Sequence, residues 1–184
     1  LDVFTCNEMD ECFNEDHPMT RLECKNYRED TFKYLIDKQI IPSSEEVNEW
    51  AMNTLVFCHY APYEFMMHED GRFIGKAIPL FNLVYHDAVL IPWMMDKRDD
   101  DYMLYALLNG GLPYLRRDSA YPNIDGSFEG HKFTLNEALK RSKEVLKLAD
   151  KVIFDEMIAH HFLDDACRKQ ETIFDNGIKV TIDL

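Results

Sequence analysis

The chain has 184 residues, of which 46% are hydrophobic and 12% aromatic, so it can bury one sizeable core and disorder is not expected. Its 34 acidic residues outnumber its 20 basic ones, and the resulting net charge of −14 repels nucleic acid and anionic lipid surfaces. We therefore expect no nucleic acid partner. No membrane span is expected either, because no stretch approaches the roughly 18 apolar residues that a spanning helix needs.

The first 43 residues predict a β-loop-α-β unit. Leu1 to Phe4 is apolar and β-branched around Asp2 and predicts a buried strand, and the acidic stretch Thr5 to Met19 predicts a long loop. Thr20 to Lys38 predicts a helix, followed by a strand from Gln39 to Ser43. The apolar stripe of that helix is predicted at Tyr27, Thr31, Tyr34 and Leu35. A right-handed crossover then makes the two strands parallel.

A second acid follows the same pattern as Asp2. In the run from Ile40 to Trp50, a short apolar strand gives way to Glu45 and Glu46. Barrel strands present catalytic acids in this way at their C-terminal ends, and two such acids on two strands are typical of glycosidases. Two structural alternatives stay open. Asp2 could cap a turn or pair with an arginine, and the glutamates could form a solvated helix N-terminus.

The middle of the chain is only partly assigned. Trp50 to Tyr60 fits a buried helix or a strand, and the rest up to Ile78 is left unassigned. Pro79 to Trp93 predicts an apolar strand that ends in Tyr85, His86 and Asp87 and is followed by a second apolar stretch. We expect this strand to be central and parallel, with His86 or Asp87 in the pocket of Glu45.

The last third alternates helices and strands. Asp99 to Leu108 predicts a short helix that ends at Gly110-Gly111, followed by a strand from Leu112 to Leu115. The capping box Thr134-Leu-Asn-Glu137 predicts a helix with further helix through about Phe162. Its buried face is predicted at Leu135, Ala138, Leu139, Ser142, Leu146 and Ala149. Alternating residues around Asn176-Gly177 predict a terminal hairpin.

Several short motifs, in this order along nearly the whole chain, resemble glycoside hydrolase family 129 and the related family 101. They are Asp2 in Leu-Asp-Val, Ser44-Glu45 before Trp50-Ala51, Val84-Tyr-His-Asp87, Asn109-Gly-Gly-Leu-Pro113 and the terminal Thr-x-Phe-x-Asn-Gly hairpin. Members of these families are retaining α-N-acetylgalactosaminidases that act on mucin-type O-glycans. The resemblance implies a carbohydrate substrate, a glycan or glycoprotein O-glycan, and a reaction that needs no cofactor.

The resemblance also implies a fold. The expected class is α/β, with residues 1–165 forming the C-terminal part of a (β/α)8 TIM-type barrel and residues 166–184 forming the first hairpin of a β domain. Such a barrel takes about 250 residues, and this chain shows only about four or five strands. Because the chain also lacks an initiator Met, we expect the missing strands to precede Leu1.

By position, Asp2 matches the family's nucleophile and Glu45 its general acid/base. Glu46 stands where the family has glycine, so the acid remains open between Glu45 and Glu46, with Glu45 preferred. A retaining mechanism then requires the carboxyl groups of Asp2 and the acid about 5 to 5.5 Å apart. Adjacent parallel strands, whose axes lie about 4.8 Å apart, can supply that distance.

Six residues are candidates for substrate binding: Glu46, Trp50, Tyr85, His86, Asp87 and Trp93. Each has a structural alternative, since the two indoles could belong to the core and His86-Asp87 could be a strand-end pair. Three other functions also stay open. They are a barrel that binds glycans without hydrolysing them, a hydrolase of a different α-glycoside, and an interaction protein that uses the acidic surface.

Thiol and metal chemistry are not expected. The five cysteines, Cys6, Cys12, Cys24, Cys58 and Cys167, show no Cys-x-x-Cys spacing and predict reduced thiols, which favours the cytoplasm over secretion. Cys58-His59 is rejected as a nucleophile pair because sequence neighbours rarely face each other. His160-His161 is rejected as a metal site for the same reason, and the acidic run at Asp99 predicts a solvated helix start.

Overall fold

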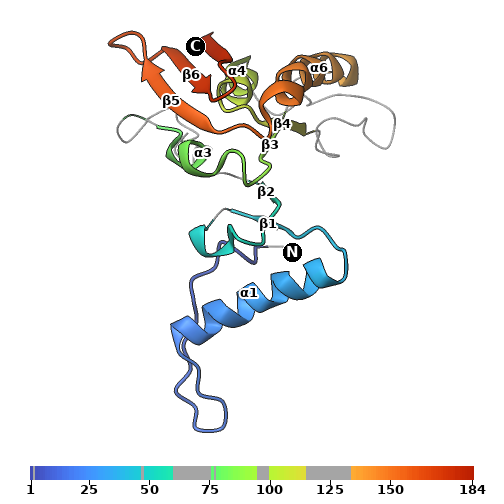
Figure 1. Ribbon diagram of the computed structural model, residues 1–184, viewed down its shortest axis with the longest axis vertical. Coiled ribbons are helices and arrows are strands. Elements are labelled where there is room, and N and C mark those ends of the chain that lie inside the picture. Colours follow the sequence, from blue (N-terminus) through green and yellow to red (C-terminus); the bar gives the residue numbers. More distant parts are fainter. Residues whose placement is uncertain (2, 47, 60–75, 77, 95–99, 115–133) are drawn as a thin grey trace.

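The computed structural model of the chain describes residues 1, 3–46, 48–59, 76, 78–94, 100–114 and 134–184 (Figure 1). Its elements, in chain order, are α1 (Arg21–Asp37), β1 (Ser43–Glu45), η1 (Glu49–Ala51), β2 (Phe57–His59), α3 (Leu80–Tyr85), β3 (Pro92–Met94), α4 (Asp100–Leu108), β4 (Leu112–Tyr114), α6 (Leu135–Val152), β5 (Met157–Phe162), β6 (Lys169–Phe174) and β7 (Lys179–Asp183). Helices and strands are thus mixed, in agreement with an α/β class. Within the described ranges, every helix is too short or too polar to cross a bilayer.

The first four strands run in the same direction. β1 pairs with β2 in parallel, with Glu45 opposite His59, and β3 pairs with β4 in parallel. A parallel bridge between Phe57 and Leu90 joins the two pairs, with the Cys58 amide donating to the Leu90 carbonyl at 3.0 Å. The spatial order is therefore β1-β2-β3-β4, with helices between successive strands along the chain.

The strand predicted at Leu1 to Phe4 is wrong. Residues 3–6 form a turn, and Val3 has a φ of +43°. Two contacts to β1 replace a ladder: the Leu1 nitrogen donates to the Ser43 carbonyl at 2.6 Å, and the Thr5 amide donates to the Ser44 hydroxyl at 3.2 Å. The strand predicted at Gln39 to Ser43 is shifted, since β1 begins at Ser43, and its ladder partner is β2.

Helix α1 confirms the predicted helix and one residue of its predicted buried face, Leu35, which packs half-buried against the cluster of Phe32 and Trp50. Thr20 caps it, because its hydroxyl accepts from the Glu23 amide while the Glu23 carboxylate accepts from the Thr20 amide at 2.7 Å. Phe32 is fully buried, with its ring 5.4 Å from Phe4 and 6.0 Å from Trp50. The predicted stripe residues Tyr27 and Tyr34 are instead 64% and 60% exposed. The core lies beneath Phe32, so the tyrosines face outward.

The predicted strand from Pro79 to Asp87 is also wrong, because this segment contains helix α3. Asn82 is buried there with its side-chain amide donating to Asn109 Oδ1 at 2.8 Å. Phe81 and Tyr85, four residues apart, place their rings 5.1 Å from each other on the helix surface. The hydrophobic periodicity of a short, continuous apolar run does not distinguish a helix from a strand. Extended structure begins only at Leu90, before β3.

The C-terminal part matches the prediction except after α6. Helix α4, strand β4, the capping box of α6 and the hairpin β6-β7 are all present as predicted. The helix predicted through Phe162 ends at Val152, because residues 157–162 form β5 and pair antiparallel with β6. The sheet β5-β6-β7 therefore crosses the predicted boundary at residue 166, and the division into two domains stays a prediction.

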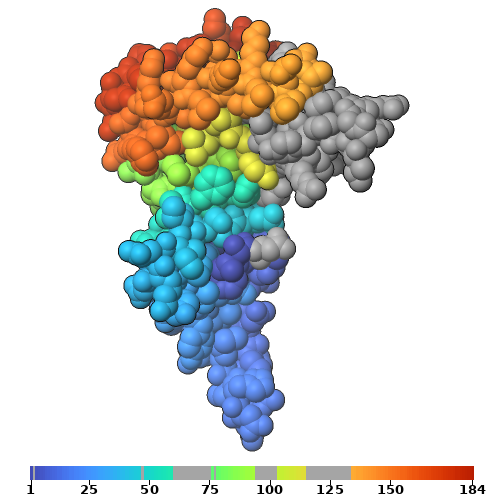
Figure 2. Space-filling model, turned by 90° about the vertical axis from the view of Figure 1, so that its right-hand side faces the viewer, coloured from blue at the N-terminus to red at the C-terminus, as the bar shows by residue number. Residues whose placement is uncertain are grey.

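Three hydrophobic clusters hold these elements together. One joins α1, η1 and β2 through Phe32, Trp50 and Cys58. A second joins β3, α4, α6 and β7, and a third packs α6 against β5 and β6 through Val152, Met157 and Phe174. The face of α6 buried here consists of Ala138, Arg141, Ser142, Val145, Ala149 and Val152, whereas the predicted Leu139 and Leu146 are exposed. Figure 2 shows the N-terminal part of the chain, in blue, narrowing at one end of the molecule.

Because Phe32 is buried and Tyr34 is exposed, truncating these two side chains of α1 should change the stability by different amounts. Phe32→Ala should lower the free energy of unfolding by about 3 to 5 kcal/mol, because it empties a filled site between two rings. Tyr34→Ala on the exposed face is the matched control and should cost less than about 1 kcal/mol. Urea unfolding checks both variants. Equal losses would contradict the buried face described for α1.

Candidate functional site

The predicted acid Glu45 lies at the C-terminal end of β1, beside His59 at the end of β2. Successive strand residues face opposite sides of a sheet, and the burial of both strands follows this alternation. Ser44 and Cys58 are buried, and Cys58 belongs to the cluster under α1. Glu45 and His59 are half-buried and therefore share the other face of the strands, away from α1.

The segment that carries the predicted nucleophile adjoins the same strand. Asp2 itself lies outside the described residues, so its distance to Glu45 stays a prediction. The residues on either side of it bind β1: Leu1 donates to the Ser43 carbonyl, and the Thr5 hydroxyl donates to the Glu45 carbonyl. The two sequence segments that carry the predicted acids are thus held side by side.

The residue after each predicted acid has left-handed backbone geometry. Val3 has a φ of +43° and Glu46 a φ of +58°, and neither is a glycine. The left-handed region costs a residue with a side chain roughly 1 to 2 kcal/mol, and β-branched residues adopt it least readily. The Glu46 amide donates to the His59 carbonyl at 2.8 Å, which fixes this turn directly after β1. A glycine would adopt this geometry without strain.

His59 and Tyr114 are polar residues at this edge that the sequence analysis did not select. Their rings meet edge to face with centroids 4.8 Å apart. Burial lowers the pKa of His59, so its imidazole is neutral at neutral pH. The sequence does contain a pattern that could have identified His59. The apolar run that begins at Val56 ends in this polar residue, which is the same pattern that selected Glu45.

Cys58, next to His59, cannot act as a nucleophile in this setting. It is buried in the cluster under α1, and burial is the main cause that raises the pKa of its thiol to about 12. Almost none of it is therefore thiolate at neutral pH. The rejection of a Cys58-His59 pair made from the sequence is in line with this environment.

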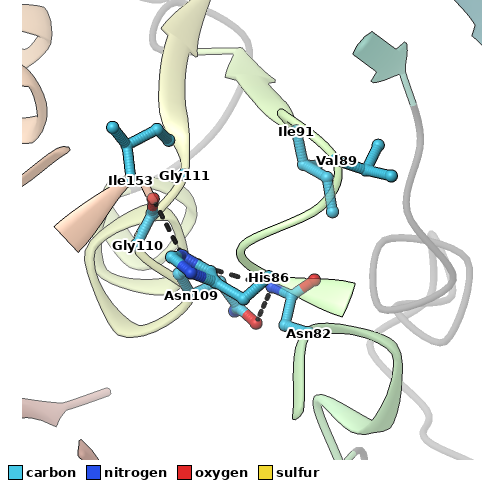
Figure 3. A pocket seen from close by; sticks show the side chains of 8 residues that line it. All are labelled: Asn82, His86, Val89, Ile91, Asn109, Gly110, Gly111 and Ile153. Atoms are coloured by element: carbon cyan, nitrogen blue, oxygen red, sulfur yellow. Dashed lines mark hydrogen bonds between the residues drawn. The ribbon is translucent and has the colours of Figure 1, made fainter. Parts of the chain in front are cut away.

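His86, predicted to bind substrate, instead contacts three segments of the core (Figure 3). Its Nδ1 lies 2.7 Å from the Asp155 carbonyl oxygen. Its Nε2 lies 3.3 Å from the Gly110 carbonyl oxygen, a contact drawn in Figure 3. Its ring centroid is 5.0 Å from that of Phe174 on β6. The small pocket that His86 and Asn82 line has no room for a water molecule. This arrangement cross-links α3, the turn after α4 and the start of β5, and it leaves no space for a sugar.

The turn after α4 passes against His86 and Trp93 without room for side chains. A Cβ atom on Gly110 would lie 2.5 Å from Nε2 of His86. One on Gly111 would clash with the indole of Trp93. Gly110 also has a φ of +58°, as expected for a residue that ends a helix.

The other substrate-binding candidates lie apart from Glu45. Trp93 is fully buried and Trp50 is 6% exposed, as the core alternative expects. Tyr85 packs on Phe81, and Asp87 is exposed after the end of α3. Of the six candidates for substrate binding, only Glu46 is next to Glu45, as the following residue in the chain. A sugar-binding role for these residues stays a prediction.

The adjacent histidines His160 and His161 lie on β5, so their rings point to opposite faces of the sheet. His160 is half-buried and its Nε2 lies 3.0 Å from Gln170 Oε1 on β6, whereas His161 is exposed. In the described part of the chain, no three His, Cys, Asp or Glu side chains come together as a ligand set for a metal ion.

Comparison with solved structures identifies similar proteins over the whole chain. The chain is 48% identical to α-N-acetylgalactosaminidase NagBb from Bifidobacterium bifidum in its GalNAc complex, with a TM-score of 0.84, covering 100% of this chain and 29% of that chain. The ligand-free form of NagBb gives 45% identity and a TM-score of 0.83 with the same coverage. Its Gal-NHAc-DNJ complex gives 46% and 0.83, again covering 100% and 29%. No family model and no curated protein matches the chain.

The chain therefore spans about 29% of the length of the solved enzymes that it resembles. The similarity extends from its first residue to its last, including the strand edge that carries Glu45 and His59. The described fold corresponds to a portion of a larger α-N-acetylgalactosaminidase-like structure.

The buried position of Cys58 predicts low thiol reactivity. In the native protein at pH 8, iodoacetamide should leave Cys58 unmodified, because a thiol with a pKa of about 12 is about 0.01% thiolate at that pH. Half-exposed Cys12 is the internal control and should be alkylated. Peptide mass spectrometry measures both sites. Alkylation of Cys58 at the rate of Cys12 would contradict its burial.

Proposed function

We propose that the protein is a retaining glycoside hydrolase of α-linked N-acetylgalactosamine and that this chain carries its two catalytic carboxylates. The observation that carries the proposal is the 45–48% identity with α-N-acetylgalactosaminidase structures over the length of the chain. One of those structures is described as a GalNAc complex, which supports a GalNAc-binding site in this chain's relatives. On the basis of the short sequence motifs, we assign the protein to glycoside hydrolase family 129 or the related family 101.

The proposed architecture is part of a (β/α)8 barrel. Four strands in parallel order, β1 to β4, with helices between them, support this proposal. In such barrels, catalytic residues stand at the C-terminal ends of several strands, and Glu45 occupies that position on β1. The rest of the barrel would come from outside these 184 residues, in keeping with the 29% coverage of NagBb.

In the proposed mechanism, Glu45 protonates the glycosidic oxygen while Asp2 attacks the anomeric carbon. The bond to the leaving group breaks as the bond to Asp2 forms, which gives a covalent glycosyl-enzyme. Glu45, now a carboxylate, then removes a proton from water, which attacks the same carbon and releases Asp2. The proposal requires carboxyl groups about 5 to 5.5 Å apart. The contacts of Leu1 and Thr5 with β1 support such proximity.

The roles of Asp2 and Glu45 predict loss of turnover in the full-length natural protein. Asp2→Asn should abolish hydrolysis of an aryl α-N-acetylgalactosaminide, and Glu45→Gln should lower kcat on the order of 10²- to 10⁴-fold. Exposed Glu49 on η1 supplies the control, since Glu49→Gln should leave kcat unchanged. The wild type should prefer this substrate over aryl α-galactoside, α-glucoside and β-anomers. GalNAc binding without hydrolysis of any of them would indicate a non-catalytic glycan-binding protein.

The nucleophile has a further signature in its product. Azide should restore turnover to Asp2→Ala and give a glycosyl azide of inverted configuration, because it attacks from the face that the carboxylate vacated. Nuclear magnetic resonance of the product determines the anomer. A glycosyl azide of retained configuration, or no rescue, would argue against Asp2 as the nucleophile.

The backbone of Glu46 gives a test that separates the two adjacent acids. Glu46→Gly removes the carboxylate and suits the left-handed geometry at φ +58°, so it should keep activity and leave the thermal midpoint equal or higher. Glu46→Val is the matched variant, because a β-branched residue is strained there, and it should lower the midpoint. Loss of turnover in a stable Glu46→Gly protein would move the acid/base role to Glu46.

A further inference from the structure

The side chain of Asn176, in the turn between β6 and β7, is bound to the end of α6. Its amide nitrogen donates to the Lys151 carbonyl at 2.8 Å and to the Asp155 carboxylate at 2.7 Å. Its amide oxygen accepts from the Ile178 amide at 2.9 Å. Both donors of the side chain and its acceptor are therefore used. These three hydrogen bonds are called the Asn176 latch below.

The latch satisfies a helix end and joins two segments. Lys151 lies in the last turn of α6, and the last carbonyl groups of a helix have no partner within it. Asp155 lies between α6 and β5, and its own carbonyl oxygen contacts His86 in the core. The turn of the hairpin is therefore fixed to a segment that the core holds in place.

The residue after Asn176 is Gly177, and this pair has a characteristic reaction. Glycine has no side chain to hinder its backbone nitrogen, which can attack the side-chain carbonyl carbon of the asparagine. The bond from that carbon to the amide nitrogen breaks, ammonia leaves with the proton of the glycine amide, and a cyclic imide forms. Water then opens the imide to aspartate or isoaspartate. The net reaction, deamidation, consumes water and replaces an amide with a carboxylate.

In the folded turn, the groups that would react are occupied. The Gly177 amide donates to the Phe174 carbonyl at 2.9 Å, and Gly177 has a φ of +87°, as in three-residue hairpin loops that end in a left-handed glycine. The side-chain amide of Asn176 is held by the latch. Attack therefore requires the turn to open. Both residues are exposed at the end of a hairpin, where local opening costs less than it does in a core.

The product of the reaction cannot re-form the latch. An aspartate at position 176 has an acceptor oxygen where Asn176 has its donor nitrogen. That oxygen would face the Lys151 carbonyl and the Asp155 carboxylate, and neither of these can donate. Two carboxylates at a hydrogen-bonding distance also repel each other. The contact that closes the turn thus becomes one that holds it open.

We propose that Asn176 is a deamidation site controlled by this latch. The closed latch protects the amide, and loss of the amide after opening converts the contact with Asp155 from an attraction into a repulsion, so the turn stays open. The residues involved belong to α6 and the antiparallel sheet, not to the strand edge of Glu45. The modification is therefore independent of the proposed glycosidase activity.

The sequence contains one other Asn-Gly pair, Asn109-Gly110, which provides an internal control. Asn109 is 1% exposed, and its amide nitrogen donates to the Tyr105 carbonyl at 2.9 Å. Its amide oxygen accepts from the Asn82 side chain at 2.8 Å (Figure 3). The two pairs have the same chemistry and differ in burial, so a difference between their rates reports on the surrounding structure.

The first test measures deamidation of the full-length natural protein in mildly alkaline buffer by peptide mass spectrometry. In urea, Asn176 and Asn109 should convert at comparable rates. In the native protein, Asn176 should convert more slowly than in urea, and Asn109 more slowly still. Asp155→Ala removes one bond of the latch and should raise the native rate at Asn176 roughly tenfold, which corresponds to about 1.4 kcal/mol, the order of one hydrogen bond. The native rate at Asn109 should stay the same.

The second test uses substitutions that imitate the product. Asn176→Asp should increase hydrogen exchange in segment 174–178, because the Ile178 amide loses the fixed acceptor that the latch provides. Adding Asp155→Asn exchanges the two side chains, so that an amide again faces a carboxylate. This double variant should return the exchange toward that of the wild type. Hydrogen exchange mass spectrometry measures all three proteins.

Three outcomes would overturn the proposal. Conversion of native Asn176 at its rate in urea would mean that the latch gives no protection. Equal acceleration at Asn176 and Asn109 in Asp155→Ala, or at neither, would mean that the latch does not control the reaction. Wild-type exchange in Asn176→Asp would mean that the product still closes the turn. Each of these results leaves the proposed function intact.

Discussion

The parallel ladder between β1 and β2 is the constraint on which the candidate site depends. It sets Ser44 beside Cys58 and Glu45 beside His59, and the alternation of strand residues sends the two pairs to opposite faces. Cys58 of the buried pair packs in the cluster that contains Phe32 of α1, and the Ser44 hydroxyl accepts from the Thr5 amide. Glu45 and His59 are half-buried on the other face of the strands. A shift of one residue in this register would exchange the two faces, burying the acid and exposing the thiol.

The antiparallel sheet is bound to the parallel strands by a few specific contacts. The Thr172 hydroxyl donates to the Leu108 carbonyl at 2.7 Å, and His86 reaches both the Asp155 and Gly110 carbonyl groups. The contacts with Leu108 and Gly110 satisfy backbone carbonyls at the end of α4, where the helix itself leaves them without partners. Ile182 of β7 adds apolar contact to the same region. The sheet β5-β6-β7 is therefore part of the packing that holds the strands.

Sequence reasoning succeeded where the signal was local and failed where packing chose between equal local options. The cap at Thr134 and the turn at Asn176-Gly177 depend on neighbouring residues only, and the structure has both. Segment 80–85 fits either helix or strand, and burial of Asn82 against Asn109 is a long-range event that no local pattern encodes. Glu45 ends an apolar run, which made it a candidate from the sequence, whereas the ring contact of His59 with Tyr114, two strands away, depends on packing that no local pattern encodes.

Gly110-Gly111 and Gly177 are constrained for different reasons, and this sets how each position tolerates change. At Gly110 and Gly111 the neighbouring side chains of His86 and Trp93 occupy the volume of any Cβ, so every other amino acid is excluded in a library that leaves those neighbours fixed. At Gly177 nothing lies within 4 Å, and only the φ of +87° restricts the choice. Asparagine or aspartate can adopt such geometry. Mutational scanning should thus find an invariant pair between α4 and β4 and a permissive glycine in the terminal hairpin, although the three look alike in sequence.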